Sequence, residues 1–275
     1  MYTLPNAKIN IGLKVVGRRQ DGYHDLQTVF YPISLSDSLE VTALKNEDRP
    51  FELLVNGITF QGEDKDNLVV KVYLALKEEF ELPPVRIYLT KHIPVGAGLG
   101  GGSSDAANMM KLLNDMFSLG LSDKEMEARL SPFGADCPFF IHNKPVYAEE
   151  IGDKFSPVSL SLKGYHLLLV KPDINISTAL AYRGVRPEMP SVDLKTLITQ
   201  TPFHLWRDVI VNDFEESIFP NYPEIAAIKQ TLYDMGAIYA SMSGSGSSVY
   251  GVFSRPIDDV SKLFPDCFTF TGTLG

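Results

Sequence analysis

The sequence has few cysteines, no long apolar run and no excess of basic residues, and each absence excludes a class of protein. Its two cysteines, Cys137 and Cys267, have neither metal-site spacing nor a CxxC partner, so we expect reduced thiols. No run approaches the roughly 20 apolar residues needed to span a membrane. The formal net charge of -9 argues against a nucleic-acid partner, because the phosphate backbone would be repelled.

The sequence also lacks the signals of a secreted protein and of a histidine-rich metal site. Residues 1–8 lack a basic segment followed by an apolar core, so we expect a soluble, cytoplasmic protein. The five histidines are scattered and form no metal cluster. Cys137 lies beside Asp136, but a small buried apolar residue is the favoured interpretation. A chain of 275 residues that is 44% hydrophobic can bury a core as one large or two smaller domains.

The most informative segment is rich in glycine. Five of the seven residues 96–102 are glycine, and they stand between a strand-like run at 85–90 and a helical pattern that begins near Ser103 and Ser104, both candidate helix caps. Glycines allow close backbone approach, and a helix start presents unpaired N–H groups with a positive dipole end. The segment therefore predicts a site for a di- or triphosphate. A flexible linker is the alternative, but linkers are seldom bracketed by a strand and a helix.

Spacing alone does not identify the nucleotide. Gly96, Gly98 and Gly101 satisfy the dinucleotide pattern, which further requires an acidic residue about 20 positions on, at the end of a strand. That region instead contains Ser122 and Glu125, a capping box that starts a helix. A Walker-type loop fails because Gly102 stands where lysine is required.

Alternating strands and helices predict two α+β layers. Strand-like runs lie at 39–43, 51–55 and 166–170, and helices are expected after Asp66, Ser103 and Ser122 and near Asp193 and Pro223. Two more strand-like runs are expected around 241–253, with the glycine- and serine-rich segment 243–248 as a tight turn between them. The polar, proline-broken stretch 151–160 suggests a boundary, which gives domains 1–155 and 156–275.

Five segments together carry a family resemblance: residues 5–13, 21–28, 94–107, 133–140 and 242–251. Their content and order resemble the GHMP kinases. The resemblance implies an α+β, two-domain GHMP kinase fold, with an N-terminal GHMP domain, a ferredoxin-like C-terminal domain and the active site in the cleft between them. The segment Asp-Gly-Tyr-His at 21–24 narrows it to members that phosphorylate the 2-hydroxyl of a methylerythritol carrying cytidine diphosphate, in isoprenoid precursor biosynthesis.

Two alternatives remain open. The first is another GHMP small-molecule kinase, of the homoserine or diphosphomevalonate type, which would have no cytidine requirement. The second is a nucleotide-binding protein without turnover, against which the presence of both Lys8 and Asp136 argues.

The resemblance implies two catalytic residues. Asp136 is the general base on the acceptor hydroxyl, although an isolated aspartate at such a break is more often a cap or turn residue. Lys8 lies beside it as a cation that keeps the carboxylate ionised and offsets charge on the phosphoryl group, whereas alone it would be interpreted as a solvated edge-strand lysine.

Four residues are implied to bind the acceptor. Asn10 faces the same side of its strand as Lys8 and is a candidate for the methylerythritol hydroxyls. His24 is expected to hydrogen-bond the edge of cytosine, while Tyr23 and Tyr182 stack on its two faces. Without the family, Tyr23 and His24 would be ordinary residues after a turn at Asp21 and Gly22.

ATP is the expected cosubstrate, accompanied by Mg²⁺ that bridges phosphate oxygens. Its protein ligands are unknown, with Ser103 as the best candidate. Without the family, Asn67 would be an ordinary helix cap and Lys91 a solvated charge. We expect a monomer or weak homodimer. The residues expected to bind ATP are Asn67, Lys91, Pro94, Val95, Gly96, Ala97, Gly98, Leu99, Gly100, Gly101, Gly102, Ser103 and Ser104.

Overall fold

The computed structural model describes residues 1–44, 49–58, 62–258, 260 and 262–275, and its contacts divide the chain into two compact units. Unit 1 comprises Met1–Ala7, Leu35–Val95 and Gly100–Lys144. Unit 2 comprises Lys8–Ser34, Gly96–Leu99 and Pro145–Gly275. Each unit thus combines segments that are far apart in the sequence. The boundary expected after residue 155 stays a prediction.

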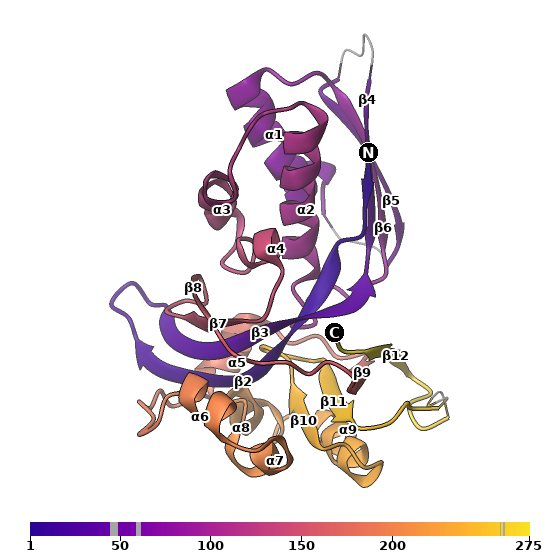
Figure 1. Ribbon diagram of the computed structural model, residues 1–275. Helices are drawn as coiled ribbons and strands as arrows, with labels where there is room; N and C mark the ends of the chain where they lie inside the picture. Colours follow the sequence, from indigo (N-terminus) through magenta and orange to yellow (C-terminus); the bar gives the residue numbers. More distant parts are fainter. Residues whose placement is uncertain (45–48, 59–61, 259, 261) are drawn as a thin grey trace. The chain divides into compact units, whose positions relative to one another are not determined.

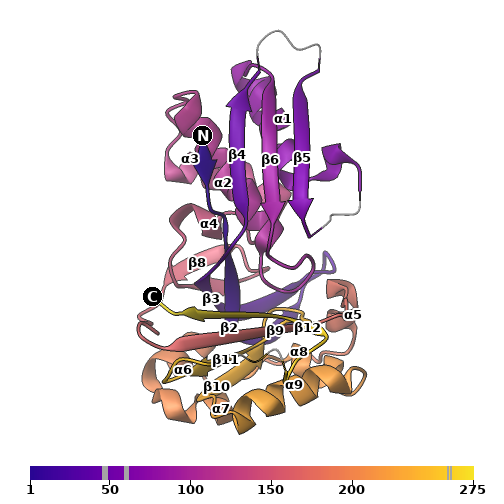
Figure 2. The ribbon, with the colours of Figure 1, turned by 90° about the vertical axis from the view of Figure 1, so that its right-hand side faces the viewer.

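A four-stranded sheet forms one layer of unit 1, and Figure 2 shows β4, β6 and β5 side by side. The strands follow the order β1-β4-β6-β5; β4 is antiparallel to β1 and β6, whereas β5 is parallel to β6. Parallel neighbours require a crossover connection, and helix α1 lies in that connection. The strands are β1 (Tyr2–Thr3), β4 (Ser38–Ala43), β5 (Phe51–Gly57) and β6 (Val85–Lys91).

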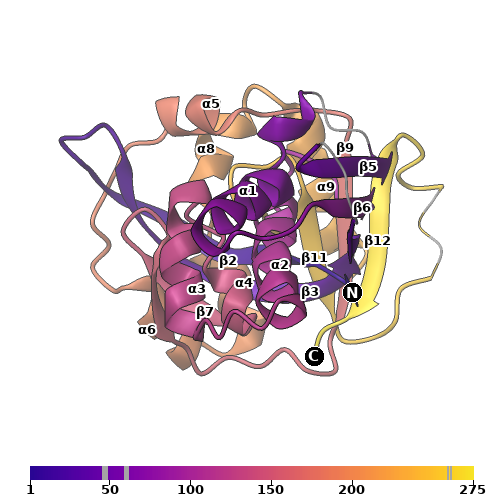
Figure 3. The same ribbon diagram turned by 90° about the horizontal axis from the view of Figure 1, so that it is seen from above.

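The helices of unit 1 lie on one side of this sheet (Figures 1 and 3); α1 and α2 contact each other, and α3 and α4 pack on α2. In β6, Val85, Ile87 and Leu89 alternate with more exposed residues and point into the core, as period-2 alternation predicts. The capping box of Ser122 and Glu125 is confirmed at the start of α3. The helices are α1 (Leu68–Phe80), α2 (Gly101–Met116), α3 (Asp123–Leu130) and α4 (Phe139–His142).

Unit 2 contains two further four-stranded sheets. One has the order β2-β3-β7-β8, and its strands are β2 (Asn6–Arg18), β3 (His24–Ser36), β7 (Val146–Glu149) and β8 (Lys154–Pro157). The other has the order β10-β11-β9-β12 and is antiparallel throughout. Its strands are β9 (His166–Pro172), β10 (Tyr239–Met242), β11 (Val249–Phe253) and β12 (Cys267–Thr273). The stretch 151–160 therefore contains a paired strand, β8.

Helix α9 packs on the second sheet because one of its faces is apolar. Ile225, Ile228 and Leu232 recur at helical spacing, are buried, and join a core cluster with Leu168 of β9 and Val249 of β11. Shorter helices complete the unit, and two of them, α5 and α8, contact each other. The helices of unit 2 are α5 (Thr178–Arg183), α6 (Leu194–Gln200), α7 (Trp206–Val209), α8 (Phe214–Ile218) and α9 (Pro223–Asp234).

Candidate active site

The glycine segment, residues 94–104, turns sharply before it enters α2. The backbone angle φ is +64° at Gly96, +77° at Gly98 and +69° at Gly100, a left-handed region in which a Cβ atom is strained. Gly100 is the N-cap of α2 and offers no side-chain hydrogen bond to the first turn. The helix start thus presents N–H groups that no side chain caps, which is the feature that binds phosphate.

The expectation that Ser103 and Ser104 cap this helix is wrong. Helix α2 begins at Gly101, and the Ser104 N–H donates to the Gly100 carbonyl oxygen at 2.9 Å, so both serines lie in the first turn. The helix starts earlier because the left-handed Gly100 directs the chain straight into it, a conformation that serine adopts poorly. Ser104 is fully buried, and its hydroxyl accepts from Asn108 Nδ2 at 3.4 Å within the same helix.

A second glycine- and serine-rich segment, residues 243–248, packs against the first. It is the turn between β10 and β11, as predicted, and the Ser243 N–H donates to the Ser248 carbonyl at 2.9 Å. A Cβ atom at Gly98 would lie 1.9 Å from the Ser243 carbonyl oxygen, so only glycine fits there. The Ser243 hydroxyl donates to the Gly98 carbonyl oxygen at 2.9 Å. The two turns therefore hold each other by direct backbone approach.

Lys8 lies in β2 and is only 3% exposed, so the interpretation as a solvated edge-strand lysine is wrong. Its Nζ donates to Asn10 Oδ1 at 2.6 Å and to the Gly98 carbonyl oxygen at 3.2 Å. The same ammonium group lies 4.7 Å from the centre of the Phe30 ring. A buried cation thus stands directly at the glycine segment.

Asn10 extends this network on the side of the strand that Lys8 also faces, which confirms the predicted alternation. Its Nδ2 donates to Thr28 Oγ1 at 3.0 Å, and the Thr28 hydroxyl donates to the Gly12 carbonyl at 2.6 Å. The Asn10 N–H donates to Ser243 Oγ at 3.1 Å. Thr28 and Ser243 were not expected as site residues, because a single hydroxyl in a strand or turn carries no signal of its distant partner.

Asp136 belongs to unit 1 and lies half-buried in the turn that precedes α4. The next residue, Cys137, is fully buried, as predicted, and burial raises the pKa of its thiol to about 11 against the opposing effect of a hydrogen bond with Ser103. Ser103 of α2 therefore adjoins the turn of Asp136 within unit 1. Lys8 belongs to unit 2, so its proximity to Asp136 stays a prediction.

The two other residues expected near ATP have clear local roles. Asn67 caps α1, because its Oδ1 accepts from the Val69 N–H at 3.1 Å. Lys91 is buried rather than solvated, and its ammonium group pairs with Asp37 and, at 2.6 Å, with Asp105. Their contacts with ATP stay predictions.

Asp37 and Asp105 flank the glycine segment, and neither is among the residues that the sequence predicts for the site. Asp37 Oδ1 accepts from the N–H groups of His92 and Ile93, at 2.6 and 2.8 Å, and so fixes the chain just before residue 94. Burial raises the pKa of Asp105 to about 7, although the Lys91 ammonium opposes this. An aspartate between apolar positions in Leu35–Leu39 is the only signal that could have drawn attention to Asp37.

Two of the three residues expected to bind cytosine, His24 and Tyr182, meet in unit 2. The rings of His24, at the start of β3, and Tyr182, in α5, stack with centroids 4.6 Å apart and planes at 16°. Tyr182 also contacts Phe214 edge-on at 4.8 Å. Tyr23 is 62% exposed in the turn before β3. A base that stacks on this face of Tyr182 must take the place of the His24 ring, so binding would require His24 to turn.

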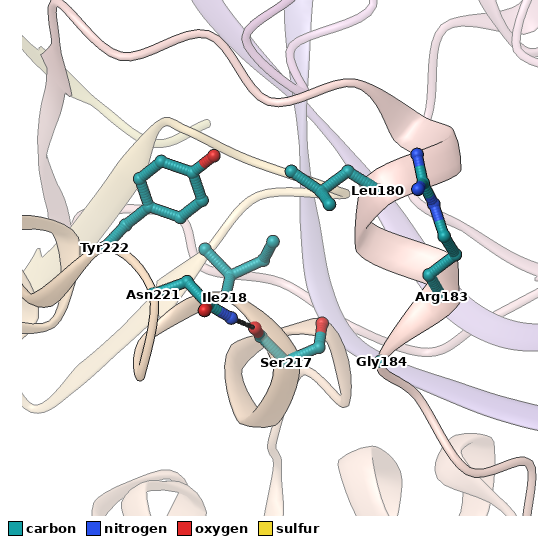
Figure 4. A pocket seen from close by; sticks show the side chains of 7 residues that line it. All are labelled: Leu180, Arg183, Gly184, Ser217, Ile218, Asn221 and Tyr222. Atoms are coloured by element: carbon teal, nitrogen blue, oxygen red, sulfur yellow. Dashed lines mark hydrogen bonds between the residues drawn. The ribbon is translucent and has the colours of Figure 1, made fainter.

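A separate cavity of about 320 Å³ lies between α5 and α8 (Figure 4). Leu180 and Arg183 of α5 and Ser217 and Ile218 of α8 line it, together with Tyr222. None of the residues expected to bind ATP or the acceptor lines this cavity. It adjoins the cytosine residues through α5, which carries Tyr182, and through α8, whose Phe214 contacts Tyr182.

The donor set limits which metal the protein could hold. Within the described part of the chain, no three His, Cys, Asp or Glu side chains gather in a way that could cage a metal ion. Mg²⁺ often keeps several waters and binds through substrate phosphates with few protein ligands, so it does not require such a cage of side chains.

A helix long and apolar enough to cross a membrane is also absent from the described residues.

Comparison with known families and proteins assigns both halves of the chain. Residues 67–144 match the model of the GHMP kinases N terminal domain, and residues 199–262 match that of the GHMP kinases C terminal region. The chain is 55% identical over 275 residues to 4-diphosphocytidyl-2-C-methyl-D-erythritol kinase of Bacteroides fragilis, covering 100% of both chains. It is 49% identical to the protein of that name from Porphyromonas gingivalis, again over 100% of both chains.

Solved structures agree with this assignment. A crystal structure of 4-(cytidine 5'-diphospho)-2C-methyl-D-erythritol kinase matches with a TM-score of 0.83 and 32% identity, covering 100% of this chain and 99% of that one. The mevalonate kinase of Methanococcus jannaschii matches with a TM-score of 0.71 at 14% identity, over 100% and 98% of the two chains, which shows a shared fold alone.

Proposed function

Because the chain belongs to the 4-diphosphocytidyl-2-C-methyl-D-erythritol kinases of the GHMP kinase superfamily, we propose the following division of labour among its residues. The enzyme uses ATP to phosphorylate the 2-hydroxyl of 4-diphosphocytidyl-2-C-methyl-D-erythritol, a step of isoprenoid precursor biosynthesis. The observation that carries the proposal is the buried Lys8 ammonium group, bonded both to Asn10 and to the glycine segment at Gly98. This arrangement supports the proposal because one cation contacts both a residue proposed to bind the acceptor and a residue proposed to bind the ATP phosphates.

The glycine segment holds the phosphates of ATP. The uncapped start of α2 supports this role, as do the three left-handed glycines, because both expose backbone N–H groups to an anion. Mg²⁺ neutralises phosphate charge when it is bound, and the Ser103 hydroxyl is the protein group we propose to reach it. Asn67 and Lys91 border the adenosine part.

Asp136 and Lys8 act on the acceptor hydroxyl. Asp136 accepts the proton of the 2-hydroxyl as that oxygen forms a bond to the γ-phosphorus, while the bond from this phosphorus to the oxygen of ADP breaks. Lys8 compensates the negative charge on the transferred group and keeps the carboxylate ionised. The burial of Lys8 supports this role, because a cation interacts more strongly with nearby charge when water is excluded.

The cytidine part of the acceptor binds at His24, Tyr182 and Tyr23. His24 reads the hydrogen-bonding edge of cytosine, and the tyrosines supply stacking surfaces. The stacked His24–Tyr182 pair supports this role, since it shows that a planar ring already packs on Tyr182. Asn10 holds the methylerythritol hydroxyls beside Lys8.

A coupled ADP-release assay tests the proposal with three acceptors: the cytidylylated substrate, its uridine analogue and 2-C-methyl-D-erythritol 4-phosphate. We expect turnover with the first and a rate about 5- to 150-fold lower with the uridine analogue, because an exocyclic donor is replaced by an acceptor. The uncytidylylated alcohol should show no measurable turnover. Equal rates with all three would overturn the base-reading pocket and favour a GHMP kinase with another acceptor.

A further inference from the structure

A buried asparagine ties the turn at residues 243–248 to helix α8. Asn212 is 2% exposed and lies two residues before α8 begins. Its Nδ2 donates to the carbonyl oxygens of Met242 and Gly244, each at 2.8 Å, and its Oδ1 accepts from the Phe214 N–H at 3.0 Å. Both halves of the amide are therefore used, which fixes it in one orientation.

The backbone around Asn212 is itself held in place. The Leu13 N–H donates to the Val211 carbonyl at 3.0 Å, and the Asp213 N–H donates to the Leu13 carbonyl at 2.9 Å, so this segment bridges to β2. Glu215 Oε1 accepts from the Met242 N–H at 2.8 Å. Asn212 thus acts from a rigid support on residues 242–244.

The position of residues 242–244 determines the position of the glycine segment. Ser243 lies between the two carbonyls that Asn212 holds, and its hydroxyl contacts the Gly98 carbonyl oxygen at 2.9 Å and the Asn10 N–H at 3.1 Å. The Gly98 carbonyl in turn accepts from Lys8 Nζ at 3.2 Å. A displacement of this turn would therefore move Gly98, Asn10 and Lys8 together.

From this chain of contacts we propose that Asn212 is a positioning residue for ATP. Its two side-chain N–H groups hold residues 242–244 where the Ser243 hydroxyl can bond to the Gly98 carbonyl. They thereby keep the glycine segment in its phosphate-binding shape. This inference rests on the proposed role of that segment. The Asn212 amide oxygen instead supports the cytidine-binding residues. It accepts from the Phe214 N–H, and the Phe214 ring contacts Tyr182 edge-on at 4.8 Å.

The substitution Asn212→Asp separates the two halves of the amide. It keeps an oxygen for the Phe214 N–H but removes both donors and leaves an oxygen facing the carbonyls of Met242 and Gly244. We expect ADP affinity, measured by calorimetric titration, to fall about 10-fold or more, since both carbonyls lose the Nδ2 donor and face a carboxylate oxygen instead. CDP affinity should stay within about 2-fold. Asn212→Ala, which also removes the oxygen, should weaken both nucleotides.

The introduced carboxyl group also supplies a pH signature. Once protonated, it can donate to one of the two carbonyls, so the ADP affinity of the Asn212→Asp protein relative to the unmodified protein should rise as pH falls from 8 to 5.5. A residue that only stabilised the fold would change ADP and CDP binding together and would show no such selective recovery.

Asn114→Asp is the matched control. Asn114 also uses both halves of its amide, with Nδ2 donating to the Leu121 carbonyl at 3.2 Å and Oδ1 accepting from the Leu121 N–H at 2.9 Å, but it lies about 20 Å along α2 from Gly101. It should lower the melting temperature and leave both affinities unchanged.

Four results would count against the inference. If Asn212→Asp keeps ADP affinity within 2-fold, or loses ADP and CDP affinity in equal proportion, Asn212 does not position the glycine segment. Should this variant fail to fold, Ser243→Ala tests the same path, and unchanged ADP affinity there overturns it equally. Failure of the unmodified protein to bind ADP would overturn the proposed function, and this inference with it.

Discussion

The two buried lysines show that burial changes the role that can be inferred for a charged residue. Lys8 and Lys91 both read as solvated lysines in the sequence, yet both are buried. Lys91 pairs with two carboxylates in unit 1, whereas Lys8 donates to an amide oxygen and a backbone carbonyl beside the glycine segment in unit 2. The contact of the Lys8 ammonium group with the glycine segment at Gly98 favours Lys8 for catalysis, because the phosphates are expected to bind at that segment.

Removing the charge of Lys8 while preserving its bulk tests this assignment. Lys8→Met retains an unbranched chain against the Phe30 ring, so the fold should be preserved, while turnover should fall about 100-fold or more. Asp136→Asn should cause a similar loss with nucleotide affinity preserved, because it removes the proposed base and leaves the glycine segment intact. Steady-state kinetics with thermal unfolding separates these effects. Near-normal turnover in either variant would remove that residue from the mechanism.

The stacked His24 and Tyr182 predict different losses when each ring is removed. His24→Ala should reduce the ratio of cytidine to uridine rates, because the hydrogen-bonding side chain is lost. Tyr182→Ala should weaken both acceptors by similar factors, since stacking depends little on the base edge and contributes about 1–3 kcal/mol per base. KM and kcat for the two acceptors provide the measurement. An unchanged ratio in the His24→Ala protein would show that another group reads cytosine.

At the scale of elements, two neighbouring glycines with the same backbone conformation differ in what surrounds them. A Cβ atom at Gly96 would meet nothing within 4 Å, whereas one at Gly98 would overlap the Ser243 carbonyl oxygen. Gly96→Ala should therefore cost only the left-handed strain of about 1–2 kcal/mol. Gly98→Ala should force the two turns apart and lower ADP affinity about 10-fold or more beyond that. Equal ADP affinities in the two variants would show that the contact with Ser243 does not shape the segment.

Local sequence patterns predicted elements better than they predicted their partners. The strand at β6, the capped helix α3 and the turn between β10 and β11 were anticipated because alternation, capping and glycine content act over a few residues. The start of α2 was predicted too late in the chain. The serines suggested a cap at 103–104, whereas the helix begins after Gly100, whose left-handed conformation the sequence pattern does not indicate. Asn212 and Asp37 were missed because their bonds join residues 30 to 56 positions apart, and one sequence carries no record of such pairings.

At the scale of the whole molecule, the buried cluster of Asp37, Lys91 and Asp105 links folding to pH. Burial raises the pKa of Asp105 to about 7, well above its ordinary value near 3.9. Between those values the folded protein binds a proton that the unfolded chain releases. The free energy of unfolding contributed by this group is therefore fully present below about pH 4 and is lost as pH rises through about 7.

Replacing Asp105 with asparagine should remove this dependence. The stability of the unmodified protein relative to Asp105→Asn should decline by about 2 kcal/mol between pH 5 and pH 7, because each pKa unit corresponds to about 1.4 kcal/mol. Urea unfolding at several pH values measures the difference. The pKa of Lys91 is raised above its ordinary 10.5 by the two carboxylates, despite burial, so its own titration lies outside this window.

Glu79→Gln is the control for this experiment. Glu79 is exposed, and its hydrogen bond with Arg129 lowers its pKa, so its contribution is lost only as pH falls below the ordinary value near 4.5. The stability difference between this variant and the unmodified protein should thus be flat from pH 5 to pH 7. If the Asp105→Asn difference were equally flat, or grew with pH, the Asp105 carboxyl would be ionised in the folded protein, and the cluster would act as a fixed ion pair that holds β6 to α2.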